Sequence, residues 1–166
     1  MVSFIYMKYT EALSKAWSEL DNIAKGRSHE VKFLNDNYTV DPGNRVILSL
    51  SCNVPAKDYL GILILHYIIK RLRGMPSIKG EWISFRELSG AEGYYNTFKK
   101  RVIDVIKRKY GERPDGILQL TERFNAKRSP LADVGVLVET FEEIPILITL
   151  WRGDEEFGPE ANVLFD

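Results

Sequence analysis

The chain has 166 residues, 23 basic side chains balanced by 23 acidic ones, and a single cysteine, Cys52. A chain of this length can bury a sizeable core without disulfides or structural metals. The zero net charge creates no overall field toward nucleic acid or an anionic membrane, and one cysteine excludes an internal disulfide or a multi-cysteine metal cluster. We therefore expect one cytoplasmic domain over residues 1–166, with no nucleic-acid or membrane partner.

The first predicted element is an amphipathic helix over residues 9–24. Leu13, Trp17 and Leu20 recur at helical spacing. The residues before it lack the basic region of a secretory signal. The most apolar segment of the chain, residues 59–69, is shorter than the roughly 20 residues that cross a bilayer.

Short strands follow, over about residues 30–51. Apolar and polar residues alternate there, and two turn sequences, Asn35-Asp36-Asn37 and Asp41-Pro42-Gly43, interrupt the alternation. This pattern predicts a meander of strands. The residues expected on its inner face are Val31, Phe33, Tyr38, Val40, Val46, Leu48 and Leu50.

Two longer helices are expected in the middle of the chain. The first begins with Pro55 in its first turn and runs to Arg73, where Gly74 ends it. It is apolar almost all round, so we expect other elements to cover most of its sides. The second spans residues 92–110. Its apolar face consists of Tyr95, Phe98, Val102, Val105 and Ile106.

The C-terminal third reads mainly as strands. After a short helix within residues 115–125, strands at 134–141 and 144–151 form a hairpin, and residues 81–85 and 163–165 are short extended pieces. Strands at both ends with helices between them predict an α+β domain, with a mainly antiparallel sheet and three to four helices.

An acidic cluster follows the last long strand, in the sequence LWRGDEEFGPEANVLFD. Carboxylates of this kind bind hard divalent cations, but the spacing does not match a calcium-binding loop. We therefore interpret the cluster as a solvated turn in which Asp154 bonds to backbone amides of its own turn. The alternative is a metal site, formed by Asp154, Glu156, Asp166 and His66.

His66 lies in the apolar helix and is expected to be a packed residue rather than a base or a metal ligand. Cys52, at a strand end, is expected to be a core residue. No glycine-rich phosphate loop or serine-hydrolase elbow occurs in the sequence.

Two tryptophans stand beside charged residues and glycine turns, in GEWISFREL and LWRGDEEF. Large aromatic side chains with polar neighbours are common where a ligand or partner docks. The other interpretation is that these tryptophans anchor the rim of the core. The candidate binding residues are Glu81, Trp82, Arg86, Trp151, Arg152, Asp154, Glu155 and Glu156.

Several segments together resemble an uncharacterised family of domains of unknown function, DUF3786, found mainly in anaerobic bacteria and archaea. The segments are EALSKAW, LHYIIK, GEWISFREL, YYNTFKKR and PILITLWRGDEEFGPEANVLFD, and the resemblance covers about residues 9–166. It implies no activity for any residue. Some members carry a cysteine-rich segment, which implies a redox or one-carbon setting, but this chain has only Cys52.

We therefore expect a non-catalytic module that binds a partner protein or a small ligand and needs no cofactor. The alternative is an enzyme that uses a hard divalent cation or a carboxylate pair at the GDEEF turn.

Overall fold

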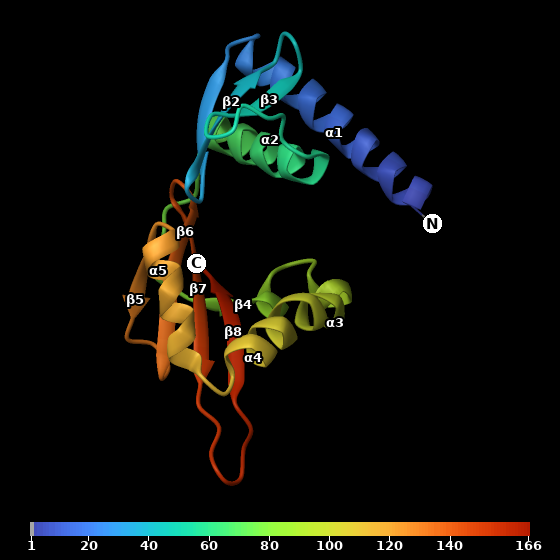
Figure 1. The fold of residues 1–166 in the computed structure, drawn as a ribbon. Helices are drawn as coiled ribbons and strands as arrows, with labels where there is room; N and C mark the ends of the chain where they lie inside the picture. Colours follow the sequence, from blue (N-terminus) through green and yellow to red (C-terminus); the bar gives the residue numbers. More distant parts are fainter. Residues whose placement is uncertain (1) are drawn as a thin grey trace. The chain divides into compact units, whose positions relative to one another are not determined.

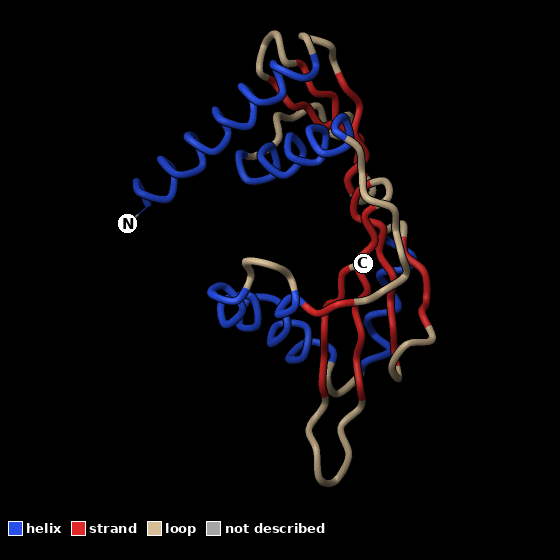
Figure 2. Tube along the Cα trace, turned by 180° about the vertical axis from the view of Figure 1, so that it is seen from behind, coloured by secondary structure: helices blue, strands red, loops and turns tan. Residues whose placement is uncertain are grey.

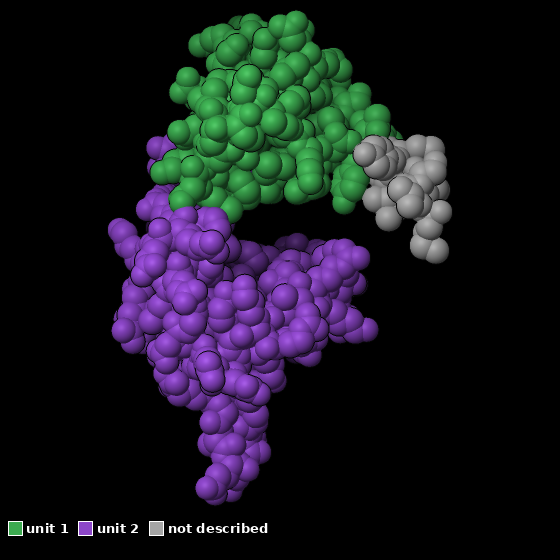
Figure 3. All heavy atoms as spheres, in the orientation of Figure 1, with its two compact units in different colours: residues 1–77 green, residues 78–166 purple. Residues whose placement is uncertain are grey.

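The computed structural model describes the backbone of residues 2–166 and the side chains of residues 9–166. The chain divides into two compact units, residues 1–77 and residues 78–166 (Figure 3). Each unit combines helices with antiparallel strands, which confirms the predicted α+β class and its mainly antiparallel pairing. The single domain over residues 1–166 stays a prediction. No helix of the described residues has the length and apolar character needed to cross a membrane.

Unit 1 consists of two helices and a three-stranded meander (Figure 1). Its elements are α1 (Val2–Ala24), β1 (His29–Phe33), β2 (Asp36–Asp41), β3 (Val46–Ser49) and α2 (Asp58–Arg73). The predicted first helix and the meander are confirmed, and α1 begins before Tyr9. The core of unit 1 is apolar and includes Trp17, Leu20, Val31, Val40, Ile64 and Leu65.

The side chains of β3 point to the opposite faces of the sheet from those predicted. The structure buries Ile47 and Ser49, whereas Val46 and Leu50 are 40% and 53% exposed. The cause is the register, in which Val40 pairs with Ile47. Directly paired residues share a face of a sheet, so Ile47 joins Val40 in the core, and a shift of one residue turns every side chain of β3 over.

Helix α2 differs from the prediction at its start and in its burial. Pro55 lies in a bridge opposite Leu48, so the helix begins only at Asp58. It ends at Arg73 as expected, and Gly74 follows with φ of 109°. The residues of α2 that are buried are Gly61, Ile64, Leu65, Tyr67, Ile68 and Ile69.

The other face of α2 is solvent-exposed. Leu63 is 46% exposed and His66 is also exposed, so the expectation of a helix covered on most sides with a packed histidine was wrong. Helix α2 packs against α1. The apolar composition of α2 exceeds what the face toward its neighbours can bury, and exposed apolar side chains are normal on folded proteins.

Unit 2 contains a sheet with strand order β5-β6-β7-β8-β4, antiparallel at every pair. The strands are β4 (Ile83–Ser84), β5 (Ala126–Ser129), β6 (Val134–Phe141), β7 (Ile144–Trp151) and β8 (Glu160–Phe165). The predicted β6–β7 hairpin is confirmed. The last strand is longer than predicted, and β5 was not predicted.

The remaining helical segments belong to unit 2. They are η1 (Phe85–Glu87), η2 (Glu92–Tyr94), α3 (Tyr95–Phe98), η3 (Lys99–Ile103), α4 (Asp104–Tyr110), η4 (Pro114–Gln119) and α5 (Leu120–Arg123). The helix predicted over residues 92–110 is therefore observed as four consecutive helical segments, η2, α3, η3 and α4. Its η3 turn is a π-helix, which adds one residue to the turn and rotates the inner face. As a result Ile103 is buried, whereas Val105, expected inside, is 40% exposed.

Different segments of the chain pack on the two faces of the unit 2 sheet. On one face an aromatic cluster joins β8 to the helical layer, with Phe85 stacked on Phe98 at 4.0 Å and Phe165 within 6.3 Å of both rings. Adjacent residues of a strand point to opposite faces, so Asp166 and Leu164 lie on the other face. The irregular segment before β4 crosses the sheet there, as the view from behind shows (Figure 2).

Candidate functional site

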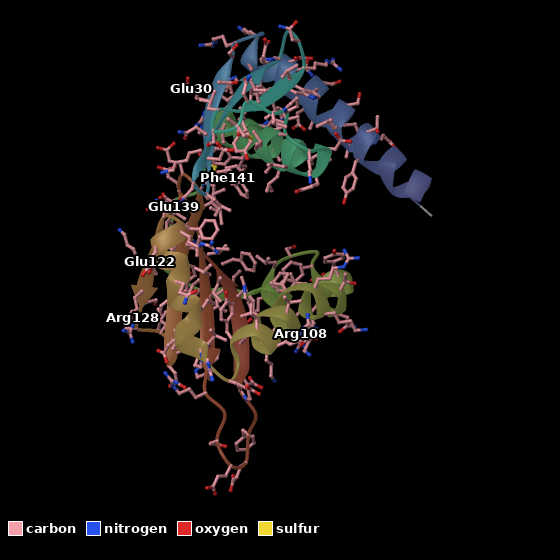
Figure 4. All side chains as sticks on the ribbon, in the orientation of Figure 1. Glu30, Arg108, Glu122, Arg128, Glu139 and Phe141 are labelled. Carbon is pink, nitrogen blue, oxygen red and sulfur yellow. The ribbon has the colours of Figure 1, made fainter. Side chains whose placement is uncertain are left out.

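One row of side chains crosses the sheet of unit 2 on the face away from the aromatic cluster. Ile83 pairs with Phe165, so the residues one step further along the two strands, Trp82 and Asp166, are neighbours. Glu139 pairs with Pro145 on the adjoining strands. Glu139, labelled in Figure 4, lies near the end of β6 where this row is found.

This row borders a cavity of about 300 Å³. Its apolar surface comes from Ile78, Leu137 and Pro145, together with the indole of Trp82. The charged lining residues are Lys127, Glu139, Glu143 and Asp166, and Gly80 and Asn125 complete the lining. The volume falls at the lower end of the range for small-molecule sites, and three carboxylates face one ammonium group.

Hydrogen bonds hold two of the carboxylates in place. The Asp166 side chain accepts the backbone N–H of Lys79 at 2.8 Å and also that of Gly80. Glu139 accepts a hydrogen bond from the Asn125 side-chain amide. Gly80 has a positive φ of 75°, a conformation that favours glycine and lets the chain turn over the Asp166 carboxylate.

The acidic turn connects β7 to β8 and lies at the opposite end of the β7–β8 hairpin from Asp166. Asp154 Oδ1 accepts the backbone N–H groups of Glu156 at 2.9 Å and Phe157 at 2.7 Å. These hydrogen bonds, first from Phe157 and then from Glu156, lower the pKa of Asp154. The interpretation of Asp154 as a residue that caps its own turn is confirmed. Glu155 and Glu156 are exposed beside it.

Trp151 and Arg152 also belong to this end of the hairpin. Trp151 is 40% exposed. Arg152 contacts Asp115 at 2.6 Å, and this pairing lowers the pKa of Asp115 and raises that of Arg152. The candidate binding residues therefore form two groups rather than one rim. In the β7–β8 hairpin Trp151 pairs with Glu160 at one end and Ile146 pairs with Phe165 at the other. At about 3.3 Å per residue, the two ends of this hairpin are roughly 17 Å apart.

Comparison with known proteins places this chain in a family. The model of a domain of unknown function, DUF3786, matches residues 12–166. The chain belongs to the DUF3786 family. No curated protein and no solved structure matches it.

Two other candidate residues of this DUF3786 protein, Glu81 and Arg86, do not line the cavity. Glu81 is exposed next to Trp82. Arg86 lies over the ring of Tyr95, with its guanidinium carbon 4.3 Å from the ring centroid. This cation–π contact attaches η1 to α3 and occupies one face of the guanidinium group.

The residues of the alternative metal site are not brought together within unit 2. Asp154 and Asp166 lie at opposite ends of the β7–β8 hairpin, which Figure 1 shows with the C-terminus far from the loop between the strands. His66 belongs to α2 of unit 1. Among the described residues of this DUF3786 chain, no three His, Cys, Asp or Glu side chains form a group able to hold a metal ion. Cys52 is exposed, which corrects its assignment to the core.

The lining residues that come from β5, β6 and the residue before β5 were not predicted from the sequence. Asn125 and Lys127 belong to a segment that is too polar to read as a strand, and Leu137 and Glu139 were assigned only to a hairpin. The available signal was the alternation of β6, where Val136 and Val138 face the core and Leu137 and Glu139 the other side. This alternation could have indicated a second, functional face.

Proposed function

We propose that this DUF3786 protein is a non-catalytic binding module and that the cavity beside Trp82 accepts a small organic cation with an apolar body. The observation that carries the proposal is the position of the Trp82 indole in a cavity that it shares with Glu139, Glu143 and Asp166. An aromatic face attracts an ammonium or guanidinium group by about 0.5–2 kcal/mol, and nearby carboxylates add to that attraction.

The charge balance of the cavity favours a cation over an anion. Three carboxylates oppose the single ammonium of Lys127. An anionic ligand would lie among these carboxylates and be repelled, whereas a cation would neutralise part of their charge. The apolar side chains of Ile78, Leu137 and Pro145 would contact the rest of the ligand and contribute about 25 cal/mol for each Å² they cover.

The hydrogen bonds to the carboxylates also support binding. Asp166 is held by backbone amides of the segment that carries Trp82, and Glu139 by Asn125. Groups fixed in this way lose little conformational freedom when a ligand arrives, and preorganisation of that kind increases affinity. A lysine or arginine side chain of a partner protein presents the same chemistry as a free amine.

The cellular setting is a proposal that depends on the single cysteine for the cytoplasm and on family resemblance for the rest. We place the protein in the cytoplasm of an anaerobe, in redox or one-carbon metabolism. The enzyme alternative at the GDEEF turn would use a divalent cation. It receives less support, because the carboxylate of Asp154 is already engaged by two amides of its own turn.

The test uses two probes with the same aromatic body and opposite charge, phenethylamine and 3-phenylpropionate, in titration calorimetry at pH 7. We expect phenethylamine to bind and 3-phenylpropionate to bind at least about tenfold more weakly, since charge repulsion replaces attraction. Equal affinities, or no saturable heat with the amine, would refute the proposal.

Variants then locate the binding. Trp82→Leu and Glu139→Gln should each weaken phenethylamine binding by roughly three- to tenfold, the size of one cation–π or exposed charge contact. Trp151→Leu is the matched control, because Trp151 lies at the other end of the hairpin. A loss of affinity in Trp151→Leu equal to that in Trp82→Leu would count against the cavity.

A further inference from the structure

The acidic groups that line the unit 2 cavity stand on different strands of its sheet. Glu139 on β6 pairs with Pro145 on β7. Ile146 pairs with Phe165 in the next pair of strands. One step further along each of these two strands, Pro145 therefore lies beside Asp166. Because directly paired residues share a face of a sheet, Glu139, Pro145 and Asp166 form one row on one face.

This row separates two acidic groups by one apolar side chain. Strand β7 lies between β6, which carries Glu139, and β8, which leads to Asp166. Neighbouring strands are about 4.8 Å apart, so the backbone positions of the two acidic residues are roughly 10 Å apart. Pro145 lies between them and also lines the cavity. The cavity therefore has two acidic positions with an apolar surface between them.

The charges of the cavity lining do not balance. The carboxylates of Glu139, Glu143 and Asp166 face the single ammonium group of Lys127. Lys127 pairs with Leu137, so its side chain lies on the same face of the sheet as the row. The formal charge of the lining is therefore two negative. A ligand with one ammonium group leaves part of this charge uncompensated, whereas a ligand with two ammonium groups balances it.

The carboxylates are accessible to a ligand. Glu139, Glu143 and Asp166 are all exposed residues. Each oxygen of Asp166 accepts one backbone amide, and Glu139 accepts the side-chain amide of Asn125 on one oxygen. A carboxylate has about four positions at which it can accept a hydrogen bond. Both acidic groups of the row therefore retain positions for the N–H groups of a ligand.

We infer that the unit 2 cavity binds a linear aliphatic diamine, and this inference rests on the proposed function of the same cavity. One ammonium group lies between the Trp82 indole and the Asp166 carboxylate, which are neighbours at the end of the row. The other ammonium group lies at Glu139, on the far side of β7. The methylene chain crosses β7 between them and covers Pro145.

The test compares three probes with the same hydrocarbon chain by titration calorimetry at pH 7. Hexylamine has one ammonium group, hexamethylenediamine has two, and 6-aminohexanoate has a carboxylate in place of the second. We expect hexamethylenediamine to bind at least about fivefold more tightly than hexylamine, because a second charge contact adds to the statistical advantage of two equivalent ends. 6-Aminohexanoate should bind more weakly than hexylamine, since its carboxylate meets charges of the same sign.

Variants then locate the second ammonium group. In Glu139→Gln the advantage of hexamethylenediamine over hexylamine should fall at least about threefold, because the second charge contact is lost while the shape is kept. Glu160→Gln is the matched control, since Glu160 lies at the far end of β8 and does not line the cavity. Lys127→Gln should bind hexamethylenediamine about two- to threefold more tightly, because it removes the positive charge of the lining. A gain in affinity does not arise from a damaged fold.

The results distinguish this inference from the proposed function. If phenethylamine and hexylamine bind and hexamethylenediamine has at most a twofold advantage, the cavity accepts single amines and the diamine inference is wrong. If none of the amines binds, the proposed function is itself wrong. An unchanged diamine advantage in Glu139→Gln would also overturn the diamine inference. So would equal affinities for 6-aminohexanoate and hexamethylenediamine, or a weaker affinity for the diamine in Lys127→Gln.

Discussion

The carboxylate of Asp166 accepts the backbone N–H of Lys79 at 2.8 Å, which joins residues 87 positions apart in the chain. The same carboxylate accepts the N–H of Gly80. One side chain at the end of β8 therefore holds the segment that carries Trp82 over the sheet. The order of the cavity should depend on this carboxylate, whether or not a ligand is present.

Asp166→Ala should release the segment before β4. We expect hydrogen exchange of the Lys79 and Gly80 amides to become roughly tenfold faster, since each loses a charge-assisted hydrogen bond. Amide-resolved exchange by NMR measures the effect. Glu160→Ala, at the far end of β8, is the control. Unchanged exchange at both amides would show that Asp166 does not hold the segment.

Asp154 should stabilise its turn in a pH-dependent way. Hydrogen bonds from Phe157 and Glu156 lower its pKa in the folded protein, so its contribution is present above the unfolded pKa of about 3.8. That contribution is lost as the pH falls through the lower folded value. We expect the Glu156 and Phe157 amides to lose protection in acid.

In Asp154→Ala the same two amides should be unprotected at every pH, whereas Glu155→Ala should behave as the native protein. The measurement is amide exchange between pH 2 and pH 6. Equal protection in native protein and Asp154→Ala at pH 6 would contradict the assignment of Asp154 to its turn.

Tyr38 should ionise at unusually high pH. Burial first, and then the hydrogen bond and the charge of Asp36, raise the pKa of Tyr38 to about 12. Asp36 also accepts the hydroxyl of Ser49 at 2.6 Å and that of Ser51. A raised pKa means that stability is fully present below the unfolded value of about 10 and decreases as the pH rises toward 12.

Tyr38→Phe should remove part of this alkaline loss of stability. Ultraviolet titration of tyrosinate should show one group fewer near pH 12, and the free energy of unfolding should fall less steeply between pH 10 and pH 12. Tyr94→Phe serves as control, because Tyr94 is 51% exposed. An identical alkaline profile in native protein and Tyr38→Phe would reject this role.

Gly135 and Gly93 offer a contrast in packing. A Cβ atom at Gly135 would lie 2.5 Å from the Leu131 carbonyl oxygen and 2.9 Å from that of Ser129, whereas a Cβ atom at Gly93 would meet nothing within 4 Å. Gly135→Ala should therefore destabilise the protein by about 1–3 kcal/mol, and Gly93→Ala should be neutral or slightly stabilising. Denaturant unfolding of both variants measures this difference, and equal stabilities would contradict the close approach.

Much of the fold follows from the sequence because local patterns determine it. The β6–β7 hairpin is predicted at its observed bounds, since two apolar strands and a two-residue acidic connection leave one arrangement. The end of α2 is likewise marked by Gly74. The face of β3 could not be predicted, because it depends on the length of the turn that sets the pairing of Val40 with Ile47.

The candidate site was harder to predict because it depends on pairing between distant segments. The sequence singles out Trp82 and Asp166 but gives no sign that β4 and β8 make them neighbours. It groups Trp151 with Trp82 by local composition, although the register places them at opposite ends of one hairpin. The role of Asp154 was predictable, because its hydrogen bonds lie within four residues.

The loop between β7 and β8 projects from unit 2 as a narrow extension (Figure 3). In this loop Phe157 is 69% exposed, and the loop has no part in lining the cavity. A fluorescent dye or an affinity peptide could therefore be attached to this loop while the cavity beside Trp82 stays intact. The hairpin provides a handle for immobilising the protein at a distance from the surface that would be assayed.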